Sequence, residues 1–349
     1  MHGVPELICA LGPDNAGSVL TGLIGRARST LDVAVYEVGP SYAWALASAA
    51  RRGARVRLIL DGHRADGNAG TASAVALAGG RVRVLDRAVA AGHWKLLVVD
   101  GREVAVGSGN LIWRDAPRHS RRGVAPVAPL LRGTREWWSV TDAAEIAGVA
   151  GAAFEAAWAA AGPPPRVWRP GASVRQDPGA VGAPAPQVEP MQLAADAGRV
   201  RLVVGGLAIA IALRTVIDAA RGRVLVTAPY VAGRAAAVRE LIAAARDAQV
   251  RGADVRFLLG TRPRPGEAVF MARSGVAARW MDPSTSTRGH AKGLIADTTA
   301  VVTSANWSRT GFGASWEAAL LMDSAPAAAY LAAAWERDWA AAQPLSSAV

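Results

Sequence analysis

Apolar and polar positions along the chain follow a helical period in some segments and form short buried runs in others, and this order occurs twice. The first half predicts an amphipathic helix bearing Leu20, Leu23, Ile24 and Ala27, a strand over residues 31–38, a helix ending at Arg52 and Gly53, and a strand over 56–60. The second half predicts a helix around 213–220, a strand over 224–228, a helix bearing Val238, Leu241, Ile242 and Ala245, and a strand over 255–259. Alternating strands and helices predict a mixed α/β sheet in each half.

The two halves also agree in their spacing. Forty residues separate Gly53 from His93, and 38 separate Gly252 from His290. Each half then ends in a strand followed by an alanine-rich helix with aromatic residues on one face. Between the halves, residues 162–190 hold eight of the 20 prolines, which is typical of a linker. We therefore expect an N-terminal half over 1–161, a proline-rich linker over 162–198 and a C-terminal half over 199–349.

Composition restricts the classes of protein to be considered. Hydrophobic residues make up 51% of the 349 residues, which excludes a disordered chain. The single cysteine, Cys9, excludes an intrachain disulfide, and no Cys/His cluster has the spacing of zinc ligands. The start shows no secretory signal, and the longest apolar stretch, 202–213, is shorter than the ~20 residues that cross a bilayer. We expect a soluble cytoplasmic protein without a metal or cofactor.

The net charge of +11 favours partners that carry phosphate, such as nucleic acid, an anionic membrane surface or a phosphorylated small molecule. An arginine-rich composition produces the same charge without any such partner. Charge alone therefore leaves both interpretations open.

Lysine usage gives the first chemical signal. The chain has 37 arginines but only two lysines, and both lie in the context His-x-Lys, at His93–Lys95 and His290–Lys292. Residues at i and i+2 of a strand share a face, so each imidazole and its lysine point the same way. Arginine does not replace a compact, titratable ammonium beside a histidine. These two lysines are therefore interpreted as chemically required.

The match extends beyond three residues. In each half an aspartate, Asp100 or Asp297, follows the lysine by five positions, and a Ser-x-Asn follows it, namely Ser108 with Asn110 and Ser304 with Asn306. This pattern resembles the HxKxxxxD motif of the phospholipase D superfamily, present twice in one chain. The resemblance covers nearly the whole chain apart from the linker. It implies two pseudo-twofold-related α/β halves, each a mixed β-sheet flanked by helices, that form one bilobal unit.

The resemblance also implies a mechanism. Two histidines, two lysines and two asparagines meet in one pocket, where the ammonium groups and amides hold the nonbridging oxygens of a phosphoryl group. One neutral histidine attacks phosphorus to give a phosphohistidine, and the other donates a proton to the leaving oxygen. The family assigns the attack to His93 and the acid/base role to His290, although the near symmetry of the halves leaves the two roles open.

Further motif positions are expected to act indirectly. Asp100 and Asp297 are expected to brace the fold. Glu136 and Glu317 are expected to hydrogen-bond and orient the histidines, and Ser108 and Ser304 to line the pocket. His63, which follows a strand end, is interpreted as structural or solvated.

One insertion distinguishes the halves. Eleven residues separate Asn306 from Glu317, whereas 26 separate Asn110 from Glu136. The insertion is rich in basic residues and has a single acid, Asp115; its basic residues are Arg114, Arg118, His119, Arg121, Arg122, Arg132 and Arg135. We expect a basic substrate-binding loop over the active site, with a solvated surface loop as the equal alternative.

The sequence thus predicts a phosphodiesterase of the phospholipase D type that hydrolyses a phospholipid or transfers it to an alcohol. The alternative is a metal-independent nuclease acting on DNA or RNA. A third interpretation, a catalytically silent phosphate-binding protein, is disfavoured because both halves keep every motif residue. An internal twofold removes the need for a dimer, so a monomer is expected, with peripheral contact to an anionic membrane.

Overall fold

A computed structural model describes residues 5–86, 90–117, 131–164, 191–194, 199–260, 263–282 and 286–345. The N-terminal half contains β1 (Glu6–Gly12), α1 (Ala16–Arg26), β2 (Thr30–Val35), α2 (Pro40–Arg51), β3 (Arg55–Asp61), α3 (Ala65–Leu77), β4 (Arg81–Leu85), β5 (Lys95–Val99), β6 (Glu103–Gly107), β7 (Leu131–Thr141) and α4 (Ala144–Ala160). A short 3-10 helix, Gly62–Arg64, joins β3 to α3.

The C-terminal half repeats this order. It contains β9 (Val200–Val204), α5 (Gly206–Ala219), β10 (Arg223–Ala228), α6 (Ala236–Val250), β11 (Asp254–Leu259), α7 (Pro265–Ser274), β12 (Ala277–Trp280), β13 (Ser286–Gly289), β14 (Gly293–Ala296), β15 (Thr299–Thr303), β16 (Ala318–Asp323), α8 (Ala325–Ala340) and β17 (Gln343–Pro344). Within the predicted linker, β8 (Met191–Ala194) pairs with β1. Residues 165–190 lie outside the described residues, and the domain boundaries stay a prediction.

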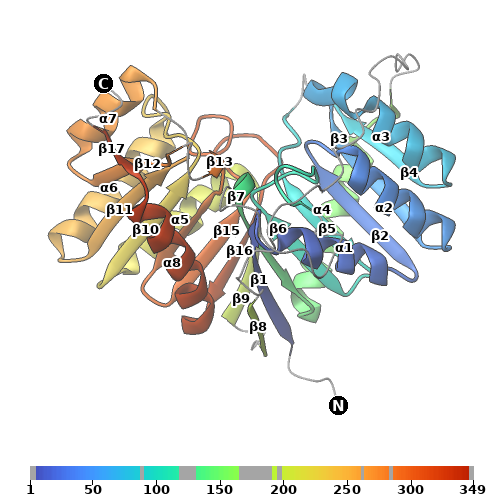
Figure 1. Ribbon diagram of the computed structural model, residues 1–349, viewed down its shortest axis with the longest axis horizontal. Coiled ribbons are helices and arrows are strands. Elements are labelled where there is room, and N and C mark those ends of the chain that lie inside the picture. The colour runs from blue at the N-terminus through green and yellow to red at the C-terminus, as the bar shows by residue number, and fades with distance from the viewer. Residues whose placement is uncertain are drawn as a thin grey trace.

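Each half is built on one mixed sheet. The first sheet has the order β4-β3-β2-β5-β6-β7-β1-β8, and the second has the order β17-β12-β11-β10-β14-β15-β16-β9. In both, a parallel set of strands joins an antiparallel hairpin, β5–β6 or β14–β15. The two lobes meet along the strands at the centre of the molecule (Figure 1). The helices α1 and α2, like α5 and α6, cover the outer faces of the two sheets, whereas α4 and α8 pack on the inner faces. The predicted fold class is confirmed.

Apolar packing divides into three cores. One core lies under α1 and α2 and another under α5 and α6, each against the outer face of its own sheet. The third core belongs to both halves, because it contains Phe154 of α4 and Trp335 of α8 together with residues of both sheets. The inner faces of the two sheets are therefore buried in a common interior. Among the helices of the described ranges, none has the length and apolar character needed to cross a membrane.

Candidate active site

The two halves exchange backbone hydrogen bonds at the motif histidines. The amide of His93 donates to the carbonyl of Trp316 at 3.0 Å, and the amide of His290 donates to the carbonyl of Arg135 at 3.0 Å. Parallel pairing of β13 with β7, and the bridge between Gly92 and Trp316, extend both contacts. Each histidine is thus fixed beside the residue that precedes a glutamate of the opposite half.

This pairing brings each imidazole to that glutamate. Nδ1 of His93 lies 3.0 Å from Oε1 of Glu317, and Nδ1 of His290 lies 2.5 Å from Oε1 of Glu136. Because a carboxylate accepts the Nδ1 proton, it fixes the tautomer and leaves Nε2 for chemistry. Both glutamates are buried, and the histidine side chains are only 17% and 13% exposed. The expected association of the glutamates with the histidines thus takes the form of a pairing across the halves.

Both lysines are fully buried beside these histidines. Lys95 donates to the carbonyl of His93. Lys292 donates to the carbonyls of His290 at 2.7 Å and Ser108 at 3.0 Å, so it also links the halves. Burial lowers the pKa of Lys95 to about 8 and that of Lys292 to about 7, against the pull of the nearby glutamates. Each ammonium is therefore close to its titration point at neutral pH.

Burial also lowers the pKa of both histidines. For His93 the second cause is Lys95, and for His290, whose pKa lies well below its ordinary value, the second cause is Lys292. Both imidazoles are consequently neutral at neutral pH. A neutral imidazole with an available Nε2 lone pair is a competent nucleophile. In His290, however, the ammonium of Lys292 lies 3.1 Å from Nε2.

The serines and asparagines of the two motifs lie in the same site. The hydroxyl of Ser108 donates to Glu136, and that of Ser304 donates to Glu317, so each serine holds the glutamate of its own half. The side-chain oxygens of Asn110 and Asn306 are buried, and among the described residues neither has a hydrogen-bond partner. These oxygens are not committed to hydrogen bonds within the fold.

Asp100 and Asp297 lie away from the site, in the turns of the β5–β6 and β14–β15 hairpins. The carboxylate of Asp100 accepts from the amides of residues 28–30, and that of Asp297 accepts from the amides of residues 221–223. Each aspartate thereby ties its hairpin to the loop before β2 or β10. This geometry is that of a structural brace.

Asp115 is a site residue that the sequence analysis did not single out. It is 3% exposed, and its Oδ2 accepts from the amide of Asn110 at 2.9 Å. Burial raises its pKa, as does the charge of Glu136. In the sequence Asp115 is the single acid among the basic residues of the insertion, and the corresponding position of the second half is Gly311, so the repeat gave no signal for it.

Asp115, Glu136 and His290 place one ligand atom each within 4.8 Å of one another, a spacing that suits a metal ion. However, the ammonium of Lys292 lies 2.8 Å from Nδ1 of the same imidazole. A cation at this position would face that positive charge at close range. The residues present therefore do not fit a resident metal well.

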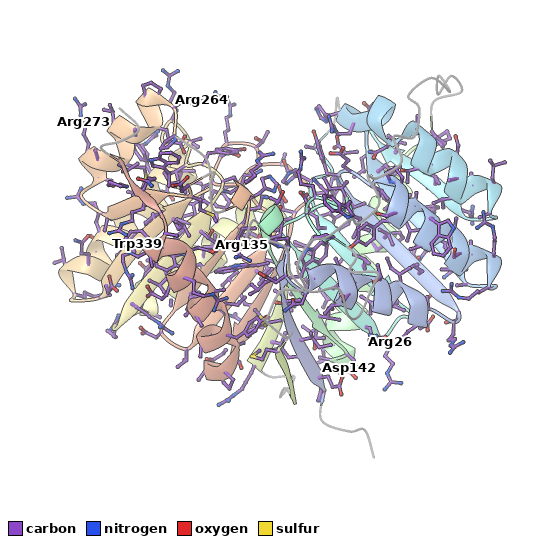
Figure 2. The ribbon with its side chains drawn as sticks, in the orientation of Figure 1. Arg26, Arg135, Asp142, Arg264, Arg273 and Trp339 are labelled. Atoms are coloured by element: carbon purple, nitrogen blue, oxygen red, sulfur yellow. The ribbon has the colours of Figure 1, made fainter. Side chains whose placement is uncertain are left out.

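The predicted basic loop is described only in part. Arg114 is half exposed beside Asp115, whereas Arg118, Arg121 and Arg122 lie outside the described residues. Including Arg135 in the loop was wrong. Arg135 lies in β7, where it is buried and paired with Asp14 and Asp338, and Figure 2 shows it at the centre of the molecule. Two carboxylates neutralise its charge, so it joins the halves.

An open pocket of about 320 Å³ adjoins His93. Both halves contribute to it, and most of its lining residues have polar side chains, including Tyr36, His63, Tyr230, Asn306, Ser308 and Thr310. This pocket leads from the surface to one of the two motif histidines.

Comparisons with known proteins agree with this arrangement. A family model described as "Cardiolipin synthase, PLD-like domain" matches residues 20–121 and 213–339. The fold is similar to that of phosphatidylserine synthase from Haemophilus influenzae Rd KW20, at 13% identity, covering 98% of this chain and 89% of that one, with a TM-score of 0.65. It is also similar to polyphosphate kinase from Porphyromonas gingivalis, at 13% identity and a TM-score of 0.59. That match covers 95% of this chain but about half (50%) of the kinase.

A search of curated protein sequences finds no match. The family model nevertheless covers most of both halves, including His93, Lys95, His290 and Lys292. The chain belongs to the family of cardiolipin synthase phospholipase D-like domains, within the phospholipase D superfamily of phosphodiesterases and transferases.

Proposed function

We propose that this protein is a phospholipase D-type enzyme that hydrolyses a phospholipid phosphodiester or transfers it to an alcohol. The observation that carries the proposal is the reciprocal pairing of His93 with Glu317 and His290 with Glu136, beside two buried lysines. Two oriented neutral imidazoles beside two buried lysines suit a two-step displacement at phosphorus.

The proposed reaction uses side chains alone. Lys95, Lys292 and the two motif asparagines hold the nonbridging oxygens. The Nε2 lone pair of one histidine attacks phosphorus, and the bond to the leaving oxygen breaks as the other histidine donates its proton to that oxygen. The same histidine then takes a proton from water or an alcohol, which attacks phosphorus and releases the first histidine. The negative charge of the bound phosphate favours the protonated imidazole that the acid step requires.

Two observations support a phospholipid as the substrate. The matching family model carries the name of cardiolipin synthase, and phosphatidylserine synthase has a similar fold along nearly the whole chain. Both names denote enzymes of phospholipid synthesis. Both halves of the site are present in one chain, so we also propose a monomer, and the net charge of +11 suits peripheral contact with an anionic membrane.

The second candidate is a metal-independent nuclease. Its support is the same positive charge, together with the arginine-rich insertion before β7. Steep loss of DNA binding with rising salt would favour this candidate, whereas vesicle binding that depends on anionic lipid would favour the phospholipase.

The test is headgroup release from mixed phospholipid vesicles in excess EDTA, comparing the wild type with His290→Ala and Glu136→Gln. We expect release by the wild type, none above background by His290→Ala, and a rate lowered by one to two orders of magnitude by Glu136→Gln, because the amide no longer fixes the imidazole as a carboxylate does. Circular dichroism verifies the fold of each variant. Release that survives His290→Ala would contradict the catalytic assignment, and DNA cleavage without lipid cleavage would favour the nuclease.

A further inference from the structure

A second buried carboxylate, that of Asp115, lies beside the imidazole of His290. Asp115 and Glu136 each offer an oxygen and His290 a ring nitrogen, and these three atoms lie within 4.8 Å of one another. Asp115 is 3% exposed, and its Oδ2 accepts from the amide of Asn110 at 2.9 Å, so the turn after β6 fixes its position. His290 therefore has a carboxylate nearby in addition to that of Glu136, which binds its Nδ1.

A glycine in the same turn makes room for both carboxylates. A Cβ at Gly109 would lie 2.7 Å from Cγ of Glu136 and 3.2 Å from Cβ of Asp115. Carbon atoms that are not bonded pack at about 3.5–4.0 Å. A side chain at this position would therefore displace the carboxylates from the imidazole.

The second half has a different pair of residues at these two positions. Ala305 takes the place of the glycine, and Gly311 takes the place of the aspartate. A Cβ at Gly311 would lie 2.1 Å from the carbonyl oxygen of Asn306, so no side chain fits there. The turn beside His93 therefore cannot carry a carboxylate at this position, and the extra carboxylate belongs to the side of His290 alone.

The two lysines also meet the two rings differently. The ammonium of Lys292 lies 3.1 Å from Nε2 of His290, whereas the ammonium of Lys95 donates to the carbonyl of His93. A ring nitrogen that accepts from an ammonium does not offer its lone pair for attack. This agrees with the acid/base role that the family resemblance gives to His290, and that role requires a proton on Nε2 when the leaving oxygen departs.

The charges around His290 decide how readily it holds that proton. Burial lowers the pKa of His290 well below its ordinary value, and the charge of Lys292 lowers it further. Arg288 and Lys95 act in the same direction, whereas the charge of Asp115 raises this pKa. Asp115 thus opposes the effects that keep the ring neutral.

Asp115 responds in turn to the proton on His290. Burial raises the pKa of Asp115, and so does the charge of Glu136. The charges of His290 and Lys292 lower it, and the half-exposed Arg114 lies 3.9 Å from the carboxylate. Protonation of His290 and ionisation of Asp115 therefore favour each other.

We propose that Asp115 is a positioning residue for the acid step, whose carboxylate stabilises the protonated form of His290; the inference rests on the proposed phospholipase function. In the first step Nε2 of His93 bonds to phosphorus and the bond from phosphorus to the leaving oxygen breaks. That oxygen takes the proton from Nε2 of His290, which then regains a proton from the water or alcohol that attacks in the second step. Asp115 acts through His290 in both steps.

The test compares two lipids whose leaving groups differ in their need for a proton. Phosphatidylpropanol would release an alkoxide, which requires the acid, whereas phosphatidyl-p-nitrophenol releases a phenolate that departs without a proton. Headgroup release is measured in a single turnover with excess enzyme in EDTA, because this isolates the first step. The ratio of the two rate constants therefore reports the acid step.

The main variant is Asp115→Asn, in which an amide oxygen still accepts from the amide of Asn110 but the charge is lost. We expect propanol release to slow by about tenfold or more, and p-nitrophenol release to change by less than about twofold. The ratio of propanol to p-nitrophenol release should also fall at a lower pH than in the wild type, because His290 loses its proton sooner. The lysines bind the phosphate of both lipids, so their titration cancels in the ratio. Asp115→Ser, with a smaller acceptor and no charge, should show the same selective loss.

Two further variants calibrate the measurement. Glu317→Gln affects the orientation of the attacking His93, so it should slow both lipids to the same extent. Asp218→Asn makes the same change of carboxylate to amide on an exposed residue that pairs with Arg214, and it should change neither rate.

Equal slowing of both lipids in Asp115→Asn and Asp115→Ser would overturn the inference, since it would assign Asp115 to the fold. Unchanged rates on both lipids would overturn it as well, and either result would leave the phospholipase function standing. Release of neither headgroup by the wild type would instead contradict the phospholipase function, and the inference with it.

Discussion

At the scale of single residues, the site depends on two lysines that are buried but still charged. The chain has no other lysine, so any titration of lysine side chains comes from Lys95 and Lys292 alone. Burial lowers both pKa values, to about 8 and about 7. Their charge is therefore lost over a pH range in which surface lysines stay protonated.

We predict opposite effects of pH on activity and stability. Above about pH 7 the lysines lose the protons that hold the phosphate, so kcat/KM should fall as pH rises towards about 9. An unfolded lysine keeps its proton to about pH 10.4, so between about pH 8 and about pH 10 the unfolded state binds more protons and the free energy of unfolding should rise with pH. Urea unfolding and initial rates across this range measure both trends.

Lys292→Met supplies the matched variant for this prediction. It removes one of the two titrating groups, so the rise in stability with pH should become shallower. An unchanged slope would show that the lysines are not the groups responsible.

Replacing either lysine with arginine should abolish most of the activity although the charge is kept. Both side chains are fully buried, and a guanidinium is larger and carries its donors in a rigid plane. We expect kcat/KM to fall by at least about 100-fold in Lys95→Arg and Lys292→Arg, by analogy with the loss of a single oxyanion donor. Rates within about tenfold of wild type would contradict the requirement for a compact ammonium.

Sequence alone predicted the motif residues because their types and spacings occur twice. It did not reveal the position of Asp115, which becomes significant only when the turn after Asn110 places its carboxylate against the amide of that residue. It also assigned Arg135 to a loop, since burial between Asp14 and Asp338 depends on α8, about 200 residues away. A sequence pattern does not show which segments far apart in the chain come into contact, and these contacts were therefore not predicted.

At the scale of elements, the two hairpin turns stand out because each holds an aspartate at positive φ. Asp100 has φ 53° and Asp297 has φ 49°, values that side chains other than those of asparagine and aspartate seldom adopt. Backbone amides from the loop before β2 or β10 donate to each carboxylate and lower its pKa although burial raises it. The motif aspartate therefore stabilises the hairpin that carries the lysine.

We predict that Asp100→Ala lowers the free energy of unfolding by about 1–3 kcal/mol, because the donors from residues 28–30 lose their acceptor and alanine is strained at this φ. Asp100→Asn, which tolerates the same φ and keeps one acceptor oxygen, should lose less. Urea unfolding measures both, and kcat of the folded variants should stay near that of the wild type. A selective loss of kcat without a loss of stability would assign Asp100 to the chemistry instead.

The strands β2, β3, β10 and β11 were predicted because branched and long apolar residues form short runs between turn residues. The helix α3 was not predicted, because its segment contains Gly67 and Gly70 and lacks a clear apolar face. The apolar stretch 202–213 also divides between β9 and α5 at Gly205, where φ is 96°. A glycine conformation thus separates two elements that hydropathy alone joins.

At the scale of the whole molecule, the shared core makes the two halves interdependent. Trp335 of α8 is 1% exposed, stacks on Trp339 at 5.0 Å and donates to the carbonyl of Val226. It belongs to the same core as Phe154 of α4 and residues of both sheets. The halves resemble each other in sequence pattern, but their inner faces are buried in one common core and not in two separate cores.

We predict that Trp335→Ala destabilises both halves together, by about 3–5 kcal/mol. Amide hydrogen exchange should lose protection to the same extent in β5 and β6 as in β14 and β15. Loss of protection confined to the C-terminal half would show that the lobes unfold independently. The exposed Val250→Ala, at 88% exposure, is the control and should leave exchange unchanged.

The exchange of glutamates between the halves has a consequence for the timing of synthesis. His93 leaves the ribosome 224 residues before Glu317, and Glu136 leaves it 154 residues before His290. A nascent chain that has already folded its first lobe therefore holds an unoriented histidine and an unmatched carboxylate. Such a chain has no complete reaction centre with which to act on a membrane lipid or a nucleic acid nearby. Completion of the polypeptide is, in this architecture, the event that activates the enzyme.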